Sequence, residues 1–190
     1  MDSARLDEII TGCKNNDRNC QKLLFELFAK KMMGVCLRYS PNYETARDMV
    51  QDGFIKVYTK ISGFKQESSV ATWMTRIFIN TCLSNLDKVE NKNLYLDIND
   101  PIVQSKTELL QADEIQAENT IKNLPVTKVL EYITQLPPKY SLVLNMYSID
   151  GFSHQQIADA LNIQIGSSKS RLSRARQLLI SIIKDKEKLN

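Results

Sequence analysis

The chain has 190 residues, of which 43% are hydrophobic and 25% are charged, and its formal net charge is +3. This length suits one ordinary domain or two small ones, and the hydrophobic content excludes general disorder. The N-terminal segment lacks the basic start and apolar run of a signal peptide, and no apolar run reaches the roughly 18 residues of a membrane span. We therefore expect a cytoplasmic protein without membrane insertion.

Residues that usually carry chemistry are scattered along the chain. The four cysteines form no C-x-x-C pair, so we expect reduced, mostly buried thiols rather than disulfides or a zinc site. The single histidine, His154, has no metal-ligating partners near it in the sequence, and Ser153 beside it is better explained as a helix cap than as a nucleophile. The sequence has no glycine-rich phosphate loop. We therefore expect no cofactor, no metal and no enzymatic activity.

Helical periodicity covers the N-terminal part of the chain, and no strand signal is present. Pro41 ends the second helix because proline removes a hydrogen-bond donor, and the Ser62-Gly63 pair ends the third. The apolar side chains of the third helix recur at spacings of three and four. These patterns predict one helical domain over residues 1–87, with helices at 4–13, 19–39, 43–61 and 69–86.

The composition changes after this domain. Residues 87–119 contain 3 Lys/Arg and 8 Asp/Glu, are rich in Asn and Gln, and include Pro101. We interpret residues 88–124 as an acidic linker, with a weak helix at 108–119.

The C-terminal part is basic and again helical. Residues 120–190 contain 10 Lys/Arg and 5 Asp/Glu, and residues 160–184 contain five basic residues and no acidic one. Such a segment favours contact with an anionic polymer, the alternative being a solvated basic helix face. The chain is thus predicted to be all-α, with two small helical domains joined by an acidic linker. The second domain spans 125–190, with helices at 127–135, 138–148, 153–161 and 167–184.

The last two predicted helices have a helix-turn-helix pattern. Ser153 and Gln156 suit a capping box, a short turn follows at 162–166, and Ser167 or Ser168 can cap the next helix. In such a pair the first turns of the second helix enter the major groove of DNA. A helical hairpin with a solvated polar face is the alternative. The candidate DNA-binding side chains are Ser168, Lys169, Ser170, Arg171, Ser173, Arg174 and Arg176.

The same part of the chain contains the motifs QLPP at 135–138, GFS at 151–153, IA at 157–158 and GSSKSRLSRAR at 166–176. These motifs resemble the fourth conserved region of sigma factors, in particular the extracytoplasmic-function class of the sigma-70 family. The family usually has glutamate where this chain has Gln156, and Thr-Val where it has Ser167-Ser168, the valine being buried. The resemblance implies that this helix-turn-helix recognises the −35 element of promoters.

The third predicted helix contains the string ARDMVQDGF at 46–54. This string resembles the sigma region that grips a coiled coil of the largest polymerase subunit. A solvated charged helix face is the alternative. The residues that the resemblance assigns to core polymerase binding are Asp48, Gln51, Asp52, Phe54 and Lys56.

Residues 64–80, FKQESSVATWMTRIFIN, resemble the part of sigma that opens the promoter and reads the −10 element. Capture of an unstacked base needs a stacking surface together with amide and hydroxyl donors. Trp73 has the spacing of a core residue and is expected to be mostly buried. The candidate −10 residues are Phe64, Lys65, Gln66, Ser68, Ser69, Thr72, Arg76 and Asn80.

Together these resemblances imply a bacterial transcription initiation factor that binds core RNA polymerase and directs it to promoter DNA. The resemblance also implies an anti-sigma factor as a partner. The alternative is a stand-alone helix-turn-helix regulator, which would bind its DNA without polymerase.

Overall fold

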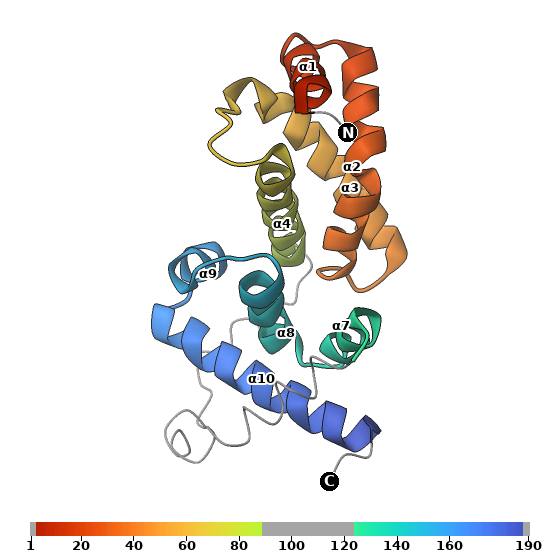
Figure 1. The fold of residues 1–190 in the computed structure, drawn as a ribbon. Helices are drawn as coiled ribbons and strands as arrows, with labels where there is room; N and C mark the ends of the chain where they lie inside the picture. The colour runs from red at the N-terminus through yellow and green to blue at the C-terminus, as the bar shows by residue number, and fades with distance from the viewer. Residues whose placement is uncertain (1–2, 89–123, 188–190) are drawn as a thin grey trace. The chain divides into compact units, whose positions relative to one another are not determined.

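The computed structural model describes residues 3–88 and 124–187, with side chains described up to residue 86 in the first range. It divides into two compact units, Met1–Glu90 and Asn91–Asn190 (Figure 1). All regular structure in the described residues is helical, which confirms the all-α prediction. The predicted linker and its weak helix at 108–119 lie almost wholly outside the described residues. No helix in the described ranges is long and apolar enough to cross a membrane.

The N-terminal unit is a bundle in which α2 packs against α1, α3 and α4, and α3 also packs against α4. Asp17 caps α2 by accepting hydrogen bonds from two backbone N–H groups, and Asn42 caps α3 by accepting one from the Thr45 N–H. The third helix ends in a short 3-10 turn instead of continuing to residue 61. The elements are α1 (Ser3–Lys14), α2 (Arg18–Leu37), α3 (Tyr43–Lys60), η1 (Ile61–Gly63) and α4 (Val70–Lys88).

The core of this unit is apolar, aromatic and sulfur-rich. Helix α3 approaches α4 closely at Gly53, where an added Cβ would lie 2.5 Å from the Phe78 ring. Phe54 meets Phe78 edge to face at 5.2 Å between centroids, and the buried Cys36 and Cys82 sulfurs lie 3.8 Å apart. Glycine is therefore needed at position 53 because any side chain there would push the two helices apart.

In the C-terminal unit the long helix α10 packs against α7, α8 and α9. The helix predicted at 138–148 is not uniform, because α8 passes into a π-helical turn, η2, at residue 145. The final helix begins two residues earlier than predicted, so Ser167 and Ser168 lie inside its first turn and do not cap it. The elements are α7 (Val126–Thr134), α8 (Pro138–Leu144), η2 (Asn145–Ile149), α9 (His154–Leu161) and α10 (Ile165–Glu187).

Candidate nucleic-acid interface

The predicted capping box at the start of α9 is confirmed. The backbone N–H of Gln156 donates to the Ser153 hydroxyl at 3.2 Å, and the backbone N–H of Ser153 donates to the Gln156 side-chain oxygen at 2.9 Å. At its other end, α9 stops at Asn162, whose left-handed backbone (φ 51°, ψ 48°) turns the chain toward α10. These local signals fix both ends of the helix that precedes α10.

Helix α10 presents its basic side chains away from the core. Its inward face consists of Leu172, Ala175, Leu179 and Ile183, all buried. Of the predicted contact residues, Lys169, Ser173, Arg174 and Arg176 are exposed, and Ser170 and Arg171 are half-buried. The first turns of α10 thus carry cationic and hydroxyl groups outside the buried stripe, and such groups can donate to phosphates or to base edges.

Ser168 does not belong to this surface. Its side chain is fully buried, and its hydroxyl lies 3.0 Å from Nδ1 of His154 in α9. The prediction that Ser168 contacts DNA is therefore wrong for the free protein. The sequence contained the signal for this, since the position is usually a buried valine in the family that the chain resembles.

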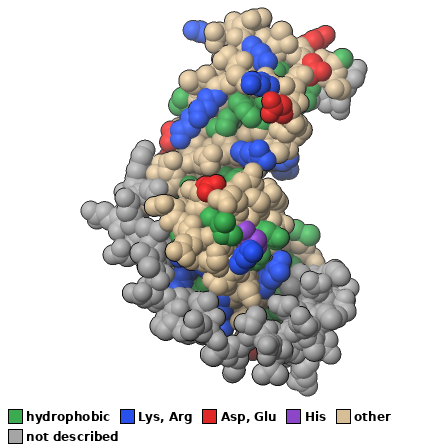
Figure 2. All heavy atoms as spheres, turned by 90° about the vertical axis from the view of Figure 1, so that its left-hand side faces the viewer, with side chains coloured by type: hydrophobic (Ala, Val, Ile, Leu, Met, Phe, Trp, Pro, Cys, Tyr) green, Lys and Arg blue, Asp and Glu red, His purple; other side chains and the backbone are tan. Residues whose placement is uncertain are grey.

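His154 occupies the first turn of α9 and was not predicted to contribute to the interface. Its ring stacks on Tyr147, with 4.5 Å between centroids and 24° between planes. Burial lowers the pKa of His154 below its ordinary value, and the nearby Lys169 and Arg176 lower it further. In Figure 2 the histidine, the purple group, lies beside side chains in the blue that marks Lys or Arg.

The charged face of α3 lies opposite its buried stripe. Asp48, Gln51 and Asp52 are exposed, and Lys56 is half-buried. Phe54 differs, because it is only 3% exposed and packs against Phe25 and Phe78 with centroid distances of 4.7 and 5.2 Å. Phe54 is therefore a core residue, and its assignment to polymerase contact is wrong for this structure.

The segment between η1 and α4 is anchored from within. Phe64 is 5% exposed, its ring lies 5.0 Å from that of Trp73, and its carbonyl oxygen accepts from the Lys14 ammonium at 2.9 Å. Because its ring is buried, Phe64 offers no free stacking surface for a base, and that assignment is also corrected. The predicted burial of Trp73 is met only in part, since this side chain is half-buried.

The remaining residues of this segment are accessible. Lys65, Gln66 and Ser69 are exposed, and Ser68 is half-buried. Gln66 adopts a positive φ of 61°, and its side-chain amide donates to Asp7 at 3.2 Å. The Ser69 hydroxyl accepts from the Thr72 N–H at 3.1 Å at the start of α4. Sequence reasoning missed Asp7 and Lys14 because both contacts join residues at least fifty positions apart.

Helix α4 continues this surface with Thr72, Arg76 and Asn80, all exposed. Their spacing of four places them in one row along the helix. The opposite side of the helix is buried in the core through Met74, Phe78 and Cys82. A row of hydroxyl, guanidinium and amide groups thus extends from the segment at 64–69.

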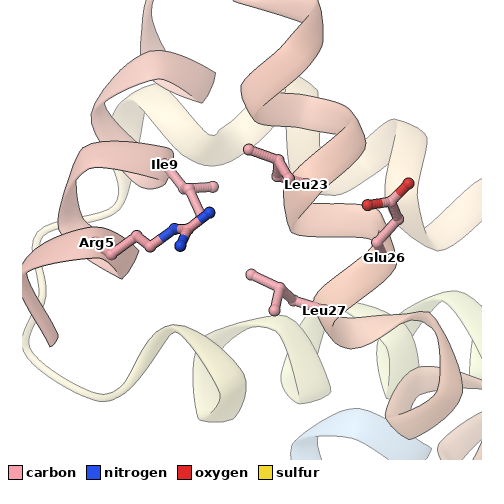
Figure 3. A pocket seen from close by; sticks show the side chains of 5 residues that line it. All are labelled: Arg5, Ile9, Leu23, Glu26 and Leu27. Carbon is pink, nitrogen blue, oxygen red and sulfur yellow. The ribbon is translucent and has the colours of Figure 1, made fainter. Parts of the chain in front are cut away.

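A hollow of about 410 Å³ is lined by residues of α1 and α2 (Figure 3). Arg5 reaches into the space between the helices, and Leu23 and Leu27 form part of its wall while remaining 37% and 42% exposed. The wall contains no pair of nucleophile and base. The described ranges also contain no cluster of His, Cys, Asp and Glu suited to a metal ion.

Two helical units, one with a helix-turn-helix and one with an exposed polar row beside a charged helix, are the arrangement of a DNA-reading initiation factor. Two family models agree with this class: "Sigma-70 region 2" matches residues 24–91, and "Sigma-70, region 4" matches residues 127–179. Together they cover more than half of the chain. The chain therefore belongs to the sigma-70 family and is a transcription initiation factor that directs RNA polymerase to promoters.

Similar curated proteins point to the extracytoplasmic-function (ECF) class. The chain is 28% identical to the "ECF RNA polymerase sigma factor SigW" of Bacillus subtilis, over 93% of this chain and 95% of that protein. It is 26% identical to the "ECF RNA polymerase sigma-E factor" of Haemophilus influenzae, over 90% and 91%.

Two solved structures share the fold. The sigma factor RpoE of Bartonella quintana, in complex with the anti-sigma factor NepR, matches with a TM-score of 0.52 and 19% identity over 86% of this chain and 96% of that one. CnrH, in complex with the cytosolic domain of CnrY, matches with a TM-score of 0.52 and 15% identity over 93% and 96%.

Proposed function

We propose that three surfaces of this sigma factor carry promoter recognition: the first turns of α10 for the −35 element, the segment at 64–69 with α4 for the −10 element, and α3 for core polymerase. The outward basic face of α10 is the observation that carries the proposal. This face is free of acidic residues, and the capping box and the left-handed Asn162 position its helix after α9.

On α10, Arg174 and Arg176 have planar guanidinium groups that suit paired hydrogen bonds to guanine or phosphate. Lys169 and Ser173 lie one turn apart on the exposed side, where they suit phosphate or base-edge contacts. We assign the −35 contacts to these residues together with Ser170 and Arg171. Ser168 supports them from the interior through its bond to His154.

For the −10 element, the accessible set consists of Lys65, Gln66, Ser68 and Ser69, followed by the α4 row of Thr72, Arg76 and Asn80. Phe64 serves a different purpose in this proposal: its buried ring and its bonded carbonyl hold the segment in shape. Single-stranded bases are recognised through polar groups on their edges and through a positive surface along the backbone, and this set offers both.

For core polymerase, the exposed Asp48, Gln51 and Asp52 of α3 form a polar face with Lys56 at its side. Helix α3 is rigidly held because its other face is buried in the bundle. A rigid acidic face of this kind suits a partner surface that carries basic residues.

We also propose that the chain acts in the cytoplasm with polymerase, has no catalytic activity of its own, and is held inactive by an anti-sigma factor. The solved structure of the sigma factor RpoE with the anti-sigma factor NepR supports the last point.

Run-off transcription with purified core polymerase tests the α10 assignment. Lys169→Ala and Ser173→Ala should reduce transcription from the cognate promoter more than from a promoter with an altered −35 element. Lys186→Ala is the matched control, because this lysine is exposed at the far end of the same helix. An equal loss of transcription on both promoters would mean that these two side chains contact only phosphates.

Core binding tests the α3 assignment. Asp52→Lys should weaken binding to core polymerase in a pull-down or fluorescence titration, whereas Glu44→Lys, at an exposed acid in the first turn of α3, should have less effect. Unchanged binding by Asp52→Lys would show that α3 does not contact the polymerase. A stand-alone regulator would instead bind promoter DNA tightly when core polymerase is absent.

A further inference from the structure

His154 links the two helices of the helix-turn-helix through a fixed imidazole ring. It is the only histidine of the chain. Its Nδ1 lies 3.0 Å from the buried Ser168 hydroxyl of α10, and its ring face stacks on Tyr147 of η2. These contacts fix the ring in position and direction and occupy Nδ1, so Nε2 is the nitrogen left to act on a ligand.

The charges around the ring are positive. Lys169 and Arg176, both exposed on α10, are charged groups that help to lower the pKa of His154. Tyr147 and Ser168, its contacts on η2 and α10, are uncharged partners. The side chain itself is half-buried, so it reaches the surface beside these two cations. The imidazole and the two cations together suit an anion. The cations disfavour the protonated form of His154, and a bound anion would favour it.

The helix-turn-helix places this group against DNA. When the second helix lies in the major groove, the first helix crosses the sugar–phosphate backbone. His154 is the first residue of α9, and it faces the first turns of α10. We propose that His154 is a phosphate ligand of the C-terminal unit: its Nε2–H donates to a DNA phosphate, and the ring takes up one proton from solvent when the unit docks on duplex DNA. This inference rests on the proposed docking of α10.

Serine at position 168 can keep its hydrogen bond to His154 in both protonation states of the imidazole. A hydroxyl can donate to a neutral Nδ1 and can accept from a protonated one, so the bond to His154 survives the change. The usual valine of the family could form neither bond. The buried Ser168 thus keeps the ring aligned while its charge changes.

The sign of the pH effect follows. In the free chain the pKa of His154 lies below its ordinary value of 6.5, and a phosphate next to the ring favours the charged form and raises the pKa. The bound state then holds more protons than the free state, so DNA affinity increases as pH falls between the two pKa values. A rise of one pKa unit corresponds to about a tenfold gain in affinity.

Proton NMR of the full-length chain tests the proposal directly. The chain has a single histidine, so the imidazole signal comes from His154. We expect the pKa of His154 to rise by about one unit or more when a saturating duplex with the −35 sequence is added. Amide shifts in α10 report docking independently. If α10 shifts while the pKa of His154 stays constant or falls, this inference fails alone. If α10 does not respond, the proposed docking fails and the inference fails with it.

A second measurement separates a phosphate ligand from a purely structural link between α9 and α10. Holoenzyme affinity for the promoter is compared between about pH 8 and about pH 5.5, a range that spans histidine titration. Relative to the natural chain, His154→Gln should lose the roughly tenfold pH-dependent gain. Ser168→Val, which removes the link and keeps the imidazole, should bind more weakly but retain a pH-dependent gain. The same pH profile for all three proteins would overturn the proposal.

Discussion

Both units pack their helices through buried apolar side chains, but the C-terminal unit adds polar links at both ends of its longest helix. In the N-terminal unit, α4 packs into the bundle through Met74, Phe78 and Cys82, which are fully buried. In the C-terminal unit, polar links join α10 to its neighbours at both ends. Ser168 bonds His154 near its start, and Tyr132 and Lys128 of α7 both contact the Glu187 carboxylate near its end. Hydrogen bonds specify the position of a helix along its axis more sharply than apolar contact does.

This difference matches the kind of surface that each unit exposes. The N-terminal unit exposes a short segment whose shape depends on buried groups behind it, whereas the C-terminal unit exposes one face of a helix that must be correctly aligned. The chain also carries a separate reporter for each unit, because its single tryptophan, Trp73, lies in the first and its single histidine, His154, lies in the second. Each unit can therefore be followed by itself in the intact protein.

The largest effect is expected in the N-terminal core. Phe78→Ala removes a fully buried ring that contacts Phe54 at 5.2 Å, and should lower the free energy of unfolding of that unit by about 3–5 kcal/mol. Urea unfolding followed by Trp73 fluorescence should show an earlier transition, while the His154 NMR signal should keep the transition of the C-terminal unit. Phe25→Ala, at a ring that is 43% exposed, is the control and should cost about 1 kcal/mol. If the urea midpoints reported by Trp73 and by His154 fell together, the two units would not unfold independently.

The next effect concerns the anchor of the segment at 64–69. Lys14→Met removes the 2.9 Å bond to the Phe64 carbonyl and should cost about 1–2 kcal/mol. We expect faster proteolysis within this segment and altered −10 preference in transcription on a promoter library. Lys22→Met is the control, because Lys22 and Glu26 form a surface pair at 3.9 Å with side chains 75% and 55% exposed. Similar results for both variants would show that the Lys14 bond does not shape the segment.

In the C-terminal unit, the cap of α9 should have a smaller effect. Ser153→Ala removes the hydroxyl that accepts from the Gln156 N–H, and should cost about 1 kcal/mol. The denaturation midpoint of the His154 signal should fall, and Trp73 fluorescence should not change. Ser181→Ala, at an exposed serine inside α10, should be neutral or slightly stabilising because alanine favours helix. An equal loss of stability for the two substitutions would show that the Ser153 cap does not stabilise α9.

The smallest effect concerns the thiols, all of which lie in the N-terminal unit. Burial, followed by Cys20 and Asp17, raises the pKa of Cys13 to about 11. At pH 8 about one thousandth of this thiol is ionised, so alkylation should be slow and should increase about tenfold per pH unit up to that pKa. The hydrogen bond to Cys36 and burial also raise the pKa of Cys82. Mass spectrometry after alkylation should find both sites protected in the native chain and modified in urea. Rapid native modification of Cys13 or Cys82 would contradict the burial of the thiols.

Local sequence signals predicted the parts of the fold that depend on neighbouring residues. The capping box of Ser153 and Gln156, and the buried stripe of α3, follow from contacts within three or four positions. The π-helical turn at η2 was missed because it is not distinguished by the apolar spacing of an ordinary helix. The anchors of the segment at 64–69 were missed because Asp7 and Lys14 are distant in sequence.

By itself, the sequence determined the helices of this sigma factor, most of their ends, and the basic character of its DNA-reading helix. Only the tertiary structure decided which of the candidate side chains are free to act. Phe54, Phe64 and Ser168 have suitable chemistry but are buried, whereas His154 reaches the surface beside two cations. The reason is physical: helix formation depends on neighbours along the chain, but exposure depends on which helices pack against a residue.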